Sequence, residues 1–147
     1  MEKKLRLKMI AAFSAEMEKA FPEFLPVKIK SMYIWPGESV WERTTESSSS
    51  FIVLSPDPKG QRDEMTIELG WSRFKRFPEL MQRPSITTTE SISTANNLNE
   101  GSVRIGSLCE DGVDWVHINE ETISETASIF ILKLRQHGMP FLNHLEV

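Results

Sequence analysis

The sequence MTIELGW, residues 65–71, shows the clearest strand pattern in the chain. Large apolar side chains occupy its odd positions, and Thr, Glu and Gly lie between them. A period of two residues places the apolar side chains on one face of an extended segment and the others on the opposite face. Residues 65–71 therefore predict a strand of a sheet that has at least one buried face.

Further strand patterns lie on both sides of this segment. Residues 27–35 alternate in polarity and end at Trp35-Pro36-Gly37-Glu38, where Pro and Gly suit the two central positions of a type II turn. Residues 51–54 are apolar on both faces, which is typical of a central strand. Glu110-Asp111-Gly112 is a hairpin turn signal. The predicted strands are 27–35, 39–46, 51–54, 65–71, 103–108 and 113–118.

Each end of the chain predicts an amphipathic helix. Within residues 2–21, apolar side chains recur every four residues and define one buried face, and Pro22 ends the pattern. The second helix begins after Asn119, a favourable N-cap residue. Gly138 and Pro140 predict its end. The buried face of this second helix is predicted to comprise Ile123, Ala127, Phe130, Ile131 and Leu134.

These elements predict an α+β fold with one mainly antiparallel sheet of about six strands. The N- and C-terminal helices are expected to pack on one face, which leaves the other face partly open to water or to a partner. The 147 residues form one domain by this interpretation, and a chain of that length can bury about 70% of its unfolded surface. An apolar fraction of 39% suffices for a core without a metal or a disulfide.

Residues 72–101 are the least regular part of the chain. Residues 72–84 are basic and aromatic, whereas residues 85–101 are rich in Ser, Thr and Asn and predict a short helix or a mobile loop. Bases mixed with aromatic side chains can contact nucleic acid. The chain is acidic overall and its bases form no long stripe, so the sequence disfavours a nucleic-acid partner.

Cysteine content and hydropathy bear on the compartment. Cys109 is the single cysteine, so no internal disulfide can form, as expected in a reducing compartment. A lysine-rich start precedes the short apolar run 9–15, which suggests a signal peptide, but the apolar spacing continues beyond the run as a helix. No apolar run approaches membrane-spanning length. The sequence therefore predicts a cytoplasmic protein that does not bind membranes.

Catalytic and cofactor patterns are weak. Cys109 and His117 are eight residues apart across the predicted hairpin and could face each other, but no third group orients the pair. The histidines and cysteine lack the spacing of a metal site, and no glycine-rich phosphate loop joins a strand to a helix. The sequence favours a non-enzymatic role with neither cofactor nor metal.

The charge distribution suggests a docking surface. Residues 85–147 hold nine acids and three bases, whereas residues 1–84 hold 12 acids and 14 bases. Such asymmetry can steer a basic partner, although acids at 110–114 also suit a turn. If Val116 and Ile118 point to the core, Trp115 stands on the open face; the reverse orientation is also open. The predicted partner-binding residues are Glu110, Asp111, Asp114, Trp115, His117, Glu120 and Glu121.

A protein-binding function is the leading hypothesis. The segment IELGWS, residues 67–72, followed by Arg76-Phe77-Pro78, resembles small bacterial α+β proteins of the toxin-immunity kind over about 12 residues. This resemblance implies a protein that neutralises a basic toxin domain, and it carries no catalytic residues. The alternative is a small-molecule-binding protein or enzyme with a pocket between the sheet and residues 72–101. Its candidate residues are His117, Cys109, Glu68 and Arg104.

Overall fold

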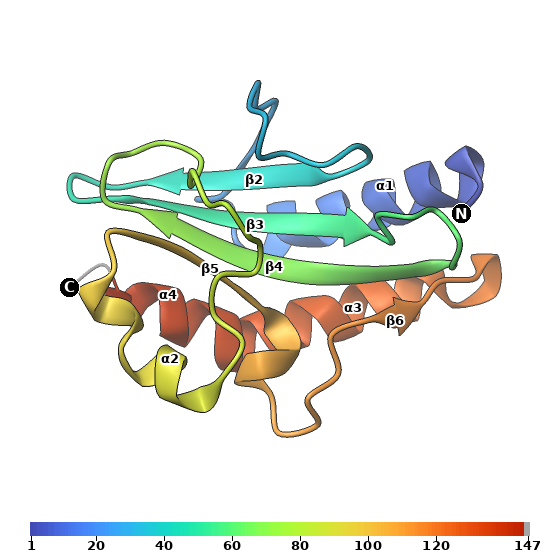
Figure 1. Cartoon of the computed structure of the whole chain (residues 1–147). Coiled ribbons are helices and arrows are strands. Elements are labelled where there is room, and N and C mark those ends of the chain that lie inside the picture. The colour runs from blue at the N-terminus through green and yellow to red at the C-terminus, as the bar shows by residue number, and fades with distance from the viewer. Residues whose placement is uncertain (146–147) are drawn as a thin grey trace.

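The computed structural model describes residues 1–145, which form an open antiparallel sheet with helices at both ends of the chain (Figure 1). The strand order is β1-β2-β3-β4-β5, and β6 pairs with the first residues of β4. This architecture confirms the predicted α+β class. The strands are β1 (Leu25–Val27), β2 (Ser39–Thr44), β3 (Ser49–Pro56), β4 (Glu64–Ser72), β5 (Glu100–Arg104) and β6 (Val116–His117). The α-helices are α1 (Lys3–Ala20), α2 (Thr89–Ser93), α3 (Ile123–Lys133) and α4 (Met139–Leu145).

The helices α1, α3 and α4 share one face of the sheet, as predicted (Figure 1). Apolar residues of these helices form one buried cluster with the inward side chains of β2 to β5. Phe13 of α1 lies at its centre, with its ring edge-on to Trp41 of β2 at 5.1 Å and to Phe130 of α3 at 6.2 Å. The four-residue spacing of the N-terminal segment therefore does define the buried face of a helix. No helix within residues 1–145 is both long enough and apolar enough to cross a membrane.

The second face of the sheet is covered, and the prediction of an open face is wrong. Residues 28–38 and residues 73–86 run across it, here called the two crossing segments (Figure 1). They seal a second apolar cluster, in which Phe77 packs edge-on against Phe51 at 5.3 Å. Because β3 is apolar on both faces, an uncovered second face would leave large side chains in water. Strand β3 and residues 65–72 of β4 are therefore buried on both faces.

The predicted strand 27–35 forms only in its first residue. β1 pairs with β2 from Leu25 to Val27, and the chain then leaves the sheet as the first crossing segment. Its alternating side chains are partly buried because they pack on the second face, without pairing to a strand. The predicted type II turn is confirmed: Gly37 has φ of 83°, and the amide of Glu38 donates to the carbonyl of Trp35 at 3.2 Å.

The predicted hairpin of residues 103–118 does not form. β5 pairs with residues 68–72 of β4 and β6 pairs with residues 64–65, so the two strands follow one another along the same edge. Residues 105–115 connect them through a 3-10 turn and a loop. Cys109 and His117 therefore do not face each other across a hairpin. Of the two alternatives predicted for residues 85–101, a short helix or a mobile loop, the structure contains the short helix, α2.

The C-terminal helical region begins as predicted and ends later. The side chain of Asn119 accepts hydrogen bonds from two amides of the 3-10 turn that leads into α3. Gly138 and Pro140 do not end the helix, because a π-helical turn at residues 134–138 leads directly into α4. Pro140 follows this π-helical turn, where the regular α-helical hydrogen bonds are already interrupted, so its missing N–H is tolerated. A Cβ on Gly138 would lie 3.3 Å from Leu69, so glycine here permits close packing on the sheet.

Candidate functional site

A surface groove lies where the loop after β5 meets the second half of α3. Its volume is about 500 Å³. The groove lies beside the exposed turn that contains Glu110 and Asp111, two of the predicted partner-binding residues. It is called the turn groove below. The residues that line it are Cys109, Glu110, Asp111, Ile129, Leu132, Lys133, Gln136 and His137.

Lys133 holds the loop against α3. Its ammonium group lies 3.2 Å from a carboxylate oxygen of Asp111 and donates to the carbonyl of Val113 at 3.5 Å. The Val113 amide also donates to Asp111 at 2.9 Å. Both contacts lower the pKa of Asp111. The hydrogen bond from the Val113 amide has the larger effect and the hydrogen bond from Lys133 the next largest. Asp111 is therefore anionic at neutral pH and fixed in place on the rim of the groove.

The floor of the groove is apolar and exposed to solvent. The side chains of Ile129 and Leu132 are 46% and 49% exposed, and nearby Val113 is 41% exposed. Ile129 and Leu132 lie on the outer side of α3, opposite the buried residues Ala127 and Phe130. The sequence prediction missed both residues, although a signal was available. Two large apolar side chains stand outside the helical stripe that was assigned to the core, which makes α3 apolar on more than one side.

The turn groove contains groups that can take part in catalysis, but the thiol is not activated. Cys109, Asp111 and His137 all line it, whereas His117, the histidine predicted to face Cys109, lies on β6. Burial raises the pKa of Cys109, and Lys133 only partly opposes that effect. The thiol is therefore protonated at neutral pH and behaves as a small apolar group. Within residues 1–145, no three His, Cys, Asp or Glu side chains are placed to hold a metal ion.

The predicted acidic residues divide between the two ends of α3. Glu110 and Asp111 lie at its C-terminal half, while Glu120 and Glu121 lie at its N-terminal end, about 16 Å away along the helix. Glu120 pairs with Lys8 of α1, and this hydrogen bond lowers the pKa of Glu120. The structure therefore places only the first two of these carboxylates at the turn groove.

Trp115 and His117 point away from the helices, in agreement with one of the two predicted orientations. Val116 packs against the main core and Ile118 is 1% exposed within it. Trp115 is half-buried, and the guanidinium carbon of Arg104 lies 5.2 Å from the centre of its ring. His117 is exposed beside Glu64, its partner in the register of β4 and β6.

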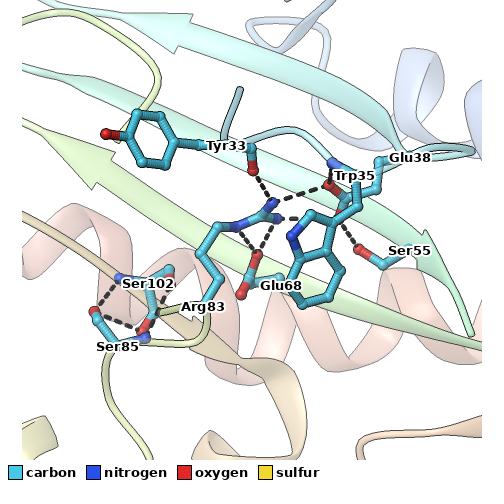
Figure 2. Close-up of polar contacts among 8 residues, drawn as sticks. All are labelled: Tyr33, Trp35, Glu38, Ser55, Glu68, Arg83, Ser85 and Ser102. Carbon is cyan, nitrogen blue, oxygen red and sulfur yellow. Dashed lines mark hydrogen bonds and ion pairs between the residues drawn. The ribbon is translucent and has the colours of Figure 1, made fainter. Parts of the chain in front are cut away.

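The most deeply buried charges in the fold were not predicted. Arg83, from the second crossing segment, inserts between Glu38 and Glu68 on the second face of the sheet (Figure 2). The three side chains are 3%, 1% and 6% exposed. They are called the Arg83 cluster below. One guanidinium thus joins the start of β2, the middle of β4 and both crossing segments.

Hydrogen bonds account for the whole guanidinium group. Its two terminal nitrogens donate to Glu38 at 2.9 and 3.0 Å, and one of them also donates to the carbonyl of Tyr33 at 2.6 Å (Figure 2). Nε donates to Glu68 at 2.8 Å, and a second terminal N–H donates to the same oxygen. The rings of Trp35 and Phe77 lie 5.1 and 5.2 Å from the guanidinium carbon. The cation is therefore paired, bonded and stacked, as buried charge requires.

The cluster holds two carboxylates and one cation, so burial acts on the surplus negative charge. Burial raises the pKa of Glu68, and the charge and hydrogen bonds of Arg83 only partly oppose this. Burial lowers the pKa of Arg83, but the bonds and charges of Glu38 and Glu68 outweigh it and raise the pKa overall. Arg83 is therefore protonated, and Glu68 is the group that titrates abnormally.

This raised pKa predicts how stability depends on pH. Above the ordinary value of 4.5 the unfolded chain has lost the Glu68 proton, while the folded chain keeps it up to its higher pKa. The folded state then binds more protons, so the free energy of unfolding falls as pH rises through this interval. We expect Glu68→Gln to remove that fall, because Gln still accepts from Arg83 and does not titrate. Urea unfolding from pH 4.5 upward measures how the free energy of unfolding depends on pH. The exposed Glu46→Gln variant is the control. The prediction is contradicted if Glu68→Gln shows the same pH slope as this control.

The alternative hypothesis, a small-molecule-binding protein or enzyme, placed a pocket between the sheet and residues 72–101, and side chains of this chain fill that space. Phe77 and Arg83 occupy it and are buried. Glu68 lies in the Arg83 cluster beside Arg104 in strand register, Cys109 lines the turn groove, and His117 is on β6. The four candidate residues of the alternative therefore do not converge on one pocket.

The basic residues of this segment are engaged by the chain itself. Arg73 donates to the carbonyl of Asn96, and Arg76 donates twice to the carboxylate of Glu100. With Arg83 buried, three of the cations that suggested contact with phosphate already have partners. These side chains therefore hold residues 73–83 against the rest of the chain.

The fold and the site define an α+β domain with a capped second sheet face and an apolar groove beside an acidic turn. Comparison with protein-family models, with curated proteins and with solved structures finds no match to this chain. Its function is therefore inferred from the geometry described above.

Proposed function

We propose that this domain is a non-enzymatic protein-binding module and that the turn groove is its docking surface. The exposure of Ile129 and Leu132 beside the acidic turn carries this proposal. Both side chains lie on a helix whose other face is fully packed, so the fold does not need them for its own core. Apolar centres with polar rims are the usual form of protein interfaces. An immunity-like role is one version of this function and remains a prediction.

The anchor residues can be tested without changing charge. We expect Ile129→Ser/Leu132→Ser to weaken partner binding at least about tenfold, because each lost apolar anchor of an interface contributes about 1 kcal/mol or more. The measurement compares proteins of the native host retained by immobilised wild-type and variant chains. Isothermal titration with the recovered partner then gives the affinities.

The matched control is Leu7→Ser on α1. Leu7 is 50% exposed, like Leu132, and also lies on a helix, so the change has the same local chemistry. We expect this variant to retain the partner. Circular dichroism and urea unfolding should show that both variants fold cooperatively. Equal retention of every captured protein by wild-type and Ile129→Ser/Leu132→Ser chains contradicts the proposed function.

A further inference from the structure

We propose that the segment bound in the turn groove is cationic and inserts a bulky apolar side chain between flanking Lys or Arg residues. This inference rests on the proposed function and names the chemistry of the partner. It depends on three features of the groove: the charge of its rim, an uncompensated carboxylate behind it and the neutrality of its floor.

The rim has an excess of negative charge. The residues that line the groove include two acids, Glu110 and Asp111, and one Lys or Arg, which is Lys133. Lys133 is only 14% exposed and already pairs with Asp111, whose side chain is 53% exposed. Glu110 is exposed and makes no hydrogen bond or ion pair within the described part of the chain. The groove therefore presents carboxylates to solvent while its one ammonium group is turned inward.

A third carboxylate lies behind the turn. Asp114 packs against Gly106, where a Cβ would lie 2.3 Å from its oxygen Oδ1. This oxygen is buried and has no hydrogen-bond partner within residues 1–145. The adjacent turn thus carries negative potential that the chain leaves uncompensated, and a partner's cation can interact with it favourably.

The floor of the groove favours an apolar side chain of the partner over a lysine or arginine side chain. Ile129 and Leu132 are one helical turn apart and supply the exposed apolar surface. The thiol of Cys109 is neutral, because burial raises its pKa. A lysine or arginine head group placed there would lose water without gaining a carboxylate, whereas an apolar side chain gains from burial. An acidic segment would meet like charge at Glu110 and Asp111, so the fit requires an apolar centre with basic flanks.

A displayed library of random peptides tests this chemistry directly. Peptides are selected on the immobilised wild-type chain and depleted on the Ile129→Ser/Leu132→Ser chain. We expect the enriched peptides to combine net positive charge with at least one large apolar residue. Their affinity should fall at high salt, since the screening length shortens from about 10 Å at 0.1 M to about 3 Å at 1 M.

A charge reversal on the rim supplies the second measurement. We expect Glu110→Lys to weaken the selected peptides several-fold, while Glu46→Lys, an exposed acid of the β2–β3 turn, leaves their affinity unchanged. Enriched peptides that are acidic or uncharged overturn the cationic partner while leaving the anchor residues supported. Failure to enrich any peptide over the depleted pool also overturns the inference. Neither result depends on the pull-down that tests the proposed function.

Discussion

Replacement of Arg83 by Met is expected to lower the free energy of unfolding by about 3–5 kcal/mol, the range found when one partner of a buried ion pair is removed. The substitution keeps an apolar stem but leaves Glu38 and Glu68 buried without their cation. It also removes the bond to the Tyr33 carbonyl, which ties the first crossing segment to the second. Urea unfolding measures the loss, and limited proteolysis should show earlier cleavage within the crossing segments.

Arg76→Met is the matched control for this prediction. Arg76 also donates two hydrogen bonds to one carboxylate, that of Glu100, but its side chain is 46% exposed. Solvent screens the pair, so its loss should lower the free energy of unfolding far less than the loss of Arg83 does. Similar small losses for the two variants contradict an anchoring role for the Arg83 cluster.

The Arg83 cluster also shows where prediction from the sequence ends. The terminal helices and the strands around residues 51–54 and 65–71 follow from local periodicity, because each buries its own repeating stripe. Arg83 and Glu38 are 45 residues apart, and neither lies in a pattern that indicates burial. Charged side chains are expected at the surface. Arg83 and Glu38 are buried because two irregular segments cross over the sheet, and no local sequence pattern indicates that crossing.

Alternation of polarity also gave a wrong strand prediction where an extended segment packs on the sheet without pairing to it. Residues 27–35 have the period of a strand, yet Ile29, Tyr33 and Ile34 pack on the second sheet face without pairing. The pattern reports half-burial of an extended chain, which a crossing segment satisfies as well as a strand does. Likewise Glu110-Asp111-Gly112 forms a local turn, with Gly112 at φ of 64°, but the strands around it pair with β4 and not with each other.

The sequence predicted only part of the candidate site, because local patterns do not show which surfaces the fold leaves uncovered. Glu110 and Asp111 were found from composition, since exposed acids in a turn need no tertiary information. Ile129 and Leu132 were missed because the period of α3 identifies a buried face but does not show that the fold leaves a second apolar side uncovered. That information depends on where α1, α4 and the loop after β5 pack.

A second large effect is expected at Gly101, which lies directly opposite Trp71 in the register of β4 and β5. A Cβ at residue 101 would lie 2.2, 2.5 and 2.9 Å from three atoms of the indole. The ring cannot move freely, because Nε1 donates to the carbonyl of Leu98 at 3.2 Å and Phe141 packs edge-on at 5.6 Å. We expect Gly101→Ala to lower the free energy of unfolding by about 3 kcal/mol, near the upper end for overpacking.

Gly70→Ala separates this steric effect from the general effect of adding a methyl group to a buried strand. Gly70 is also buried in β4, but a Cβ there meets its nearest atom, in Pro78, at 3.4 Å, so we expect a change below about 1 kcal/mol. Trp71→Leu should make room for the methyl group, so the loss in Gly101→Ala/Trp71→Leu should be smaller than the sum of the two single losses. Urea unfolding of the four chains of this cycle gives the coupling. Additive losses would show that the indole does not set the requirement for glycine, and would place its cause in the backbone of β5.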